Sequence, residues 1–159
     1  MQFQQHVDVS AATFYQNLLH SIQLEYAYHH GQMADAPEEL SLEAGMSYQV
    51  ESEAGSYRVE LHELLPNERY ETVIYSNRGR THIIYEIEPT PDDNGALITY
   101  RETTESANIF QRWNELLIGT LFKKKIKQGV QRKIEQIAHL NLGNNIKKQK
   151  INKGDEQNV

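Results

Sequence analysis

Between residues 46 and 103 the chain alternates apolar and polar residues in five stretches, and only short gaps interrupt them. This two-residue period is typical of strands, whose successive side chains point to opposite faces. The gaps hold turn residues such as Gly, Pro, Asn and Asp, and they are too short for crossover connections. The pattern therefore predicts an antiparallel meander with strands at 46–52, 57–63, 69–75, 81–87 and 96–103.

The same alternation predicts which side chains face the core. We expect the charged positions of these strands to face water, with two apolar exceptions, Val73 and Ile84, on that outer face. The expected inward set is Tyr48, Val50, Tyr57, Val59, Leu61, Tyr70, Thr72, Ile74, Ile83, Tyr85, Ile87, Ile98 and Tyr100.

A strand and a helix are predicted before the meander. Residues 3–9 alternate like a half-buried strand, and Ser10 follows as an N-cap for a helix over 11–30. Its apolar stripe is Phe14, Leu18, Ile22 and Tyr26 at helical spacing. A break near Ser21, which would give two short helices, stays an open alternative.

One long helical pattern follows the meander, from about residue 107 to residue 141. Such a helix spans roughly 50 Å, whereas an eight-residue strand spans roughly 26 Å. We therefore expect its last turns to overhang the sheet or to meet a partner. Residues 143–159 are polar and lysine-rich without periodicity, so we predict one domain over 1–142 and a disordered tail.

This order of elements resembles the helix-grip fold of the START-like superfamily. The likeness rests on the opening run 7–14 with Leu18 and Leu19, and on the late strands 85–89 and 95–102, and it extends to a group of uncharacterised proteins of Gram-positive bacteria. The resemblance implies an α+β fold in which a curved antiparallel meander wraps a long C-terminal helix. It also implies a cavity between sheet and helix, in which members often bind apolar ligands.

Tyrosines supply the best candidate binding residues. Tyr57, Tyr70, Tyr85 and Tyr100 occupy inward positions on four strands, and each combines an apolar ring with a hydroxyl that needs a partner when buried. Hydroxyls that converge in an apolar cavity could orient a ligand, although ordinary core aromatics would show the same pattern. Glu102 follows Tyr100 on the same face, where a desolvated carboxyl could carry a proton or, near the strand end, simply be solvated.

The long helix adds three candidates for the lining of the cavity, Trp113, Gly119 and Phe122. Gly119 and Gly129 each cost about 1 kcal/mol relative to Ala inside a helix, which indicates a close approach, a bend or a tolerated surface glycine. The helix also carries apolar positions at Ile126, Val130, Ile134 and Ile137, beside a lysine-rich run.

Charge and composition exclude several classes of function. Residues 1–122 hold six arginines, no lysine and 19 acidic residues, a formal charge of −13, whereas residues 123–159 carry +7. An acidic body with a basic end disfavours nucleic acid as a partner. There is no cysteine, so disulfides and thiolate zinc sites are excluded. We predict no metal site and no cofactor, since His29 and His30 are adjacent and no cofactor motif occurs.

Three functions are compatible with these features. We expect a protein that binds a small apolar or amphipathic molecule rather than an enzyme. The alternatives are a cyclase, dehydratase or isomerase that uses Glu102, and a homodimeric interaction module that uses the C-terminal helix. The first residues lack the pattern of a secretory signal and no stretch is long and apolar enough for a membrane span, so a cytoplasmic location is expected.

Overall fold

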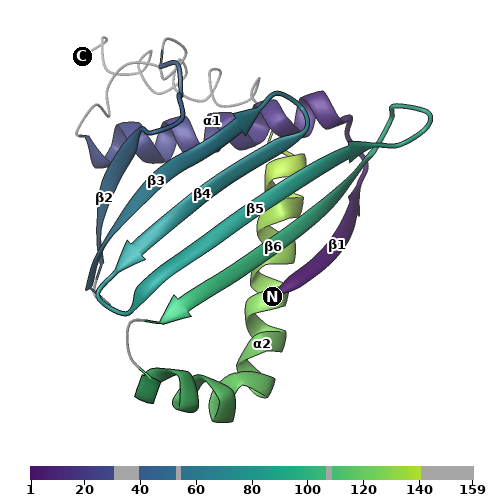
Figure 1. Cartoon of the computed structure of the whole chain (residues 1–159). Helices are drawn as coiled ribbons and strands as arrows, with labels where there is room; N and C mark the ends of the chain where they lie inside the picture. The colour runs from purple at the N-terminus through teal and green to yellow at the C-terminus, as the bar shows by residue number, and fades with distance from the viewer. Residues whose placement is uncertain (31–39, 53–54, 107–108, 141–159) are drawn as a thin grey trace, which may run out of the picture.

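A computed structural model describes residues 1–30, 40–52, 55–106 and 109–140; for Ser52, Ser106 and residues 109–123 it describes the backbone only. The fold is α+β, a six-stranded antiparallel sheet with two helices on one of its faces (Figure 1). The elements follow the order β1 (Gln2–Val7), α1 (Ala11–His29), β2 (Ser47–Ser52), β3 (Gly55–Leu65), β4 (Arg69–Ser76), β5 (Gly79–Pro89), β6 (Ala96–Ser106) and α2 (Ile109–Ala138).

The sheet confirms the predicted meander. Its strand order is β1-β6-β5-β4-β3-β2, so β2 to β6 pair with their sequence neighbours and β1 joins the free edge of β6. Asn67, in the turn before β4, and Gly79, the first residue of β5, adopt positive φ angles of 64° and 132°, where the sequence predicted turn residues. The hairpins are tighter than expected, and for this reason β3 and β5 each extend two residues beyond both of their predicted ends.

Helix α1 forms as one continuous helix, without the break considered near Ser21. The Ser10 hydroxyl accepts a hydrogen bond from the amide of Thr13 at 3.2 Å, which is the predicted N-cap. Phe14, Leu18 and Ile22 are buried in the main core together with inward residues of the sheet.

The last turns of α2 pack into the core, although the sequence predicted that they would overhang the sheet or meet a partner. These turns carry buried Ile134, Ile137 and Ala138, which belong to the main core. Figure 1 shows the first turns of α2 at an angle to the rest and beyond the end of the sheet that lies opposite α1. The last turns are buried because α1 covers them, and a comparison of helix and strand lengths could not reveal that contact.

A buried amide joins the two helices. Asn17 is 3% exposed, and its Nδ2 donates to the carbonyl oxygens of Ile137 at 2.8 Å and Ala138 at 3.3 Å. These carbonyls belong to the last turn of α2, where the helix supplies few further amides, although the Leu140 amide also donates to the carbonyl of Ile137 at 3.2 Å. Asn17 therefore acts as a C-terminal cap for α2, supplied from a distant part of the chain.

The outer face of the sheet is charged and partly covered by its own side chains. Arg69 contacts Glu63, Glu71 and Glu86, and Arg101 also pairs with Glu86. Val73, expected among solvated residues on this face, is 0% exposed. It lies opposite Glu60 and His82 in the neighbouring strands, and long or planar side chains there shield it.

Candidate functional site

Aromatic rings form a row across the face of the sheet that the helices cover. Tyr70 pairs with Tyr85 in register, Tyr85 with Tyr100, and Tyr100 with Phe3, so one ring comes from each of β4, β5, β6 and β1. The ring centroids are 6.0, 5.2 and 5.3 Å apart along this row, and the rings are tilted or edge-to-face. These separations lie within the range in which aromatic pairs attract one another. We call these four residues the aromatic row.

The row is buried, and burial changes the acidity of its hydroxyls. Tyr70, Tyr85 and Tyr100 all belong to the main core. Loss of solvation raises the pKa of each of these three phenols above its ordinary value. The negative charge of Glu102 raises the pKa of Tyr85 and Tyr100 further.

Glu102 lies next to the row on β6, two residues after Tyr100, on the face predicted for it. It is half-buried, and the Tyr100 hydroxyl donates to its Oε2 at 2.7 Å. This hydrogen bond holds the carboxylate against the Tyr100 hydroxyl. Glu102 thus lies on the same face as Tyr100, as predicted, and the hydrogen bond between them is a further finding of the structure.

A second carboxylate, that of Glu25 on α1, which the sequence analysis missed, influences Tyr48 on β2. Burial raises the pKa of Tyr48 on β2, and the charge of Glu25 and its hydrogen bond with Tyr48 raise it further. The charge of Glu25 also contributes to the raised pKa of Tyr70. Glu25 follows Ile22 by three residues on α1, so its place on the apolar stripe was the signal that could have identified it.

Tyr48 is enclosed by aromatic side chains of α1. Its ring lies 5.8 Å from that of Tyr26, edge-on, and 5.7 Å from the imidazole of His29, stacked. Tyr57 contributes to this second cluster, with Val50, Val59 and Ile74, and not to the aromatic row. The structure therefore brings together Tyr70, Tyr85, Tyr100 and Glu102 and separates Tyr57 from them.

The remaining sequence candidates have different outcomes. The side chains of Trp113 and Phe122, and the surroundings of Gly119, lie outside the described residues. A Cβ added at Gly129 would meet nothing within 4 Å, so this glycine is a surface position and not a point of close approach. Among the described residues, a search for three or more His, Asp or Glu side chains that could hold a metal ion finds none.

The C-terminal helix offers less apolar surface to a partner than predicted. Ile134 and Ile137 are buried within the chain, and Val130 packs partly against the core. Of the four apolar positions proposed for a dimer contact, Ile126 is the exposed one, at 49%. An open depression along α2 is lined by polar side chains, namely Gln128, Gln131, Arg132 and Glu135.

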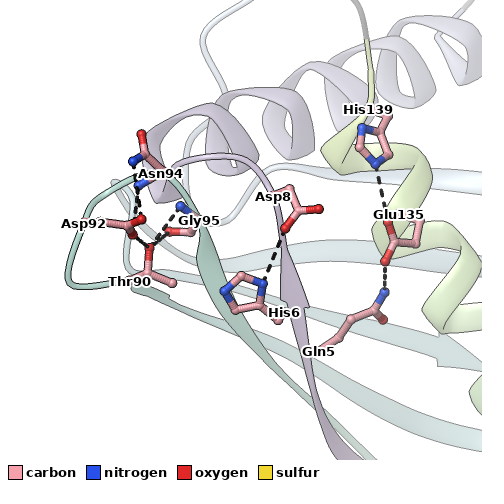
Figure 2. A network of polar contacts seen from close by, with 9 residues as sticks. All are labelled: Gln5, His6, Asp8, Thr90, Asp92, Asn94, Gly95, Glu135 and His139. Atoms are coloured by element: carbon pink, nitrogen blue, oxygen red, sulfur yellow. Dashed lines mark hydrogen bonds and ion pairs between the residues drawn. The ribbon is translucent and has the colours of Figure 1, made fainter.

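Polar contacts hold β1 against α2 beside the row. Gln5 Nε2 donates to Glu135 Oε1 at 2.5 Å, and Glu135 lies 3.5 Å from His139 (Figure 2). Gln5 points to the same face as Phe3, so α2 is tied directly next to the aromatic row.

None of the described helices is long and apolar enough to cross a membrane.

Comparison with known proteins assigns the family. Residues 1–123 match the family model described as "Domain of unknown function (DUF3284)". The chain belongs to this family. A search of curated proteins finds no match.

Solved structures share the fold of this DUF3284 domain. The structure of Ara h 8.0201 is similar, with a TM-score of 0.57, 13% identity and coverage of 89% of this chain and 97% of that one. A START superfamily protein from Mycobacterium smegmatis has a TM-score of 0.51 at 14% identity and covers 86% and 97%. A structural genomics protein from Mesorhizobium loti has a TM-score of 0.53 at 12% identity and covers 86% and 94%. The START-like helix-grip fold predicted from the sequence is confirmed.

Proposed function

We propose that this domain binds a small apolar or amphipathic molecule on the helix-covered face of its sheet, against the aromatic row. The observation that carries the proposal is the combination of three adjacent buried tyrosines with a carboxylate that is hydrogen-bonded at one end of them. Rings provide apolar contact area, and hydroxyl and carboxylate groups provide orientation, which is the usual composition of a small-molecule site. The START-like fold supports a binding role but does not by itself assign one.

Native mass spectrometry of gently purified protein tests the proposal. We expect the native mass to exceed the denatured mass by that of one small molecule, which organic extraction then recovers. Tyr85→Phe removes a hydroxyl from the row and should lower the occupied fraction. Tyr75→Phe is the matched control, because Tyr75 lies on the outer face with Arg58 over its ring at 4.4 Å.

Two results together would contradict the binding function. One is a native mass equal to that of the polypeptide alone. The other is the absence of any amide chemical-shift change in the aromatic row when octanol is added. The first result alone is also expected for a weak ligand that is lost during purification. The second result excludes that explanation, because octanol would then fail to bind the row even at high concentration.

The Tyr100–Glu102 hydrogen bond favours one second candidate, an enzyme of the cyclase, dehydratase or isomerase type. A carboxylate that accepts a hydrogen bond from a phenol at 2.7 Å is held in position to remove a proton from a bound molecule. Incubation of the recovered molecule with the protein would then yield a product, and Glu102→Gln would abolish its formation. Unchanged recovery of the molecule with both proteins would favour the carrier.

A further inference from the structure

Helix α2 carries a concentration of exposed positive charge. Residues 123–140 hold six lysines and arginines and a single acidic residue, Glu135, whereas residues 1–122 hold six arginines and 19 acidic residues. The side chains of Lys124, Lys125, Arg132 and Lys133 are all exposed. Residues 141–159 add four lysines and two acidic residues, so the excess of positive charge continues in the sequence that follows the helix.

Gly129 lies at the centre of a small basic surface on this helix. The nearest neighbours on a helix surface are three and four residues away, and for Gly129 these are Lys125, Ile126, Arg132 and Lys133. A Cβ added at Gly129 would meet nothing within 4 Å, and Ile126 is 49% exposed. We call these five residues the basic face of α2. Three cations and one apolar side chain therefore surround a patch of bare backbone.

The cations of the basic face are not neutralised by the part of the chain that the structure describes. The ion pairs found there use histidines or the arginines of the sheet, and none includes Lys125, Arg132 or Lys133. Glu135 accepts a hydrogen bond from Gln5 and lies 3.5 Å from His139 instead. Like charges that are neighbours on a helix repel one another, so a negatively charged surface would stabilise the basic face.

The basic face points away from the sheet. Ile134 and Ile137, on the opposite side of α2, are buried in the core that the sheet and the helices enclose (Figure 1). The outer face of the sheet, on the other side of the molecule, carries arginines paired with the carboxylates of Glu60, Glu63, Glu71, Glu86 and Glu105. An anionic partner therefore finds uncompensated cations on the helical side of the molecule.

The composition of the basic face favours a lipid surface over a protein partner. Protein interfaces are enriched in aromatic residues and depleted in lysine, whereas this face has two lysines and no aromatic residue. An exposed apolar side chain among cations is typical of helices that lie in the boundary between lipid headgroups and acyl chains. A second copy fits poorly, because two basic faces repel each other, and a basic face against the sheet of another copy would form an open chain.

We propose that the basic face docks this domain on a membrane surface rich in anionic lipids. Lys125, Arg132 and Lys133 contact the lipid phosphates, and Ile126 enters the headgroup layer beside the gap at Gly129. Each cation close to an anionic membrane contributes about a fivefold gain in affinity. The proposal is independent of the binding function proposed above, because it uses none of the residues of the aromatic row.

Co-sedimentation of the whole chain with lipid vesicles tests the docking. We expect binding to vesicles of equal parts phosphatidylglycerol and phosphatidylcholine, and none to vesicles of phosphatidylcholine alone. An increase of the salt concentration from about 0.1 M to about 1 M shortens the screening length from about 10 Å to about 3 Å and should release most of the bound protein.

Two triple variants of equal net charge identify the surface that docks. Replacement of Lys125, Arg132 and Lys133 together by Gln should weaken binding to the anionic vesicles by about a hundredfold. Replacement of Arg58, Arg80 and Arg101 together by Gln removes the same charge from the outer face of the sheet and should weaken binding by less than about tenfold, because these arginines lie on the far side of the molecule. Circular dichroism confirms that both variants are folded.

A fluorescent label reports which residues touch the lipid. The chain has no cysteine, so Ile126→Cys and Glu88→Cys each create a unique labelling site. A dye that brightens in apolar surroundings should respond to anionic vesicles at position 126 and remain unchanged at position 88, an exposed position on β5.

Four outcomes would overturn the proposal. They are no binding to anionic vesicles at low salt, equal binding to both kinds of vesicle, a larger loss in the sheet variant than in the helix variant, and binding of soluble polyglutamate without binding of vesicles. The last would assign an acidic polypeptide to the basic face. None of these measurements depends on a molecule bound at the aromatic row, so the binding function is judged separately by native mass spectrometry.

Discussion

At the scale of single residues, Asn17 shows how one side chain can decide a helix–helix contact. Its amide is buried and donates to two carbonyls at the end of α2. Helix ends leave carbonyl groups without intrahelical partners, and in a buried position water cannot replace the missing donor. A polar residue within the otherwise apolar stripe of α1 is therefore required by the helix that packs against it.

Replacement of this donor should destabilise the fold. We expect Asn17→Ala to lower the free energy of unfolding by about 1–3 kcal/mol, the usual cost of leaving buried polar groups unpaired. Urea denaturation followed by far-ultraviolet circular dichroism measures the change. Gln16→Ala, at the exposed neighbouring position, should change it by less than about 0.5 kcal/mol. Equal effects of both variants would show that the cap contributes nothing.

At the scale of elements, β1 must lie close to the start of β6. A Cβ added at Gly95 would meet His6 Cε1 at 2.9 Å and the carbonyl oxygen of Val7 at 3.0 Å. The turn before β6 is also internally bonded, since the Thr90 hydroxyl donates to Asp92 and accepts from the Gly95 amide (Figure 2). The turn cannot easily move away, so a glycine is needed where the N-terminal strand joins the sheet.

Two glycines should therefore respond to alanine in opposite directions. Gly95→Ala should destabilise the protein by about 1–3 kcal/mol, because the added methyl group overpacks against the β1 backbone. Gly129→Ala, in open space on α2, should stabilise it by up to about 1 kcal/mol through better helix propensity. Thermal unfolding midpoints measure both effects. A loss of stability in Gly129→Ala would indicate that something closely approaches this surface after all.

At the scale of the whole molecule, the sheet and both helices enclose an interior rich in phenols. Tyr48, Tyr70, Tyr85 and Tyr100 are all buried, and each has a raised pKa for which burial is the main cause. The unfolded chain would ionise these phenols near their ordinary pKa of about 10. The folded chain must keep them neutral, so folding and protonation are linked.

Stability should therefore fall in alkaline solution. A group whose pKa is raised by folding contributes its full stability below the unfolded pKa and loses it as the pH rises toward the folded pKa. We expect the free energy of unfolding to decrease from about pH 10 upward, with absorbance of these phenolates at 295 nm rising only as the chain unfolds. Tyr70→Phe should flatten this dependence. If all tyrosines of the folded chain titrate near their ordinary pKa, the predicted link between folding and phenol protonation is wrong.

The sequence by itself determined the elements and the faces of the strands. Period-two alternation with short, turn-rich gaps permits only an antiparallel meander, and side-chain direction alternates by geometry. Tyr70, Tyr85, Tyr100 and Glu102 could therefore be assigned to one face, and Ser10 to a helix start, before any contact was known. These inferences succeeded because they depend on local backbone geometry alone.

Only the tertiary structure decided which of these residues meet. A bulge after Leu61 turns Leu64 toward the core, and strand register aligns Tyr85 with Tyr70 and Tyr100 while Tyr57 lies elsewhere. The packing of α1 across the sheet brings Glu25 to Tyr48 and buries the last turns of α2, which helix length alone had suggested would overhang the sheet or meet a partner. Such contacts join residues distant in the chain, and the energies that select them arise from packing and burial in three dimensions rather than from any local pattern.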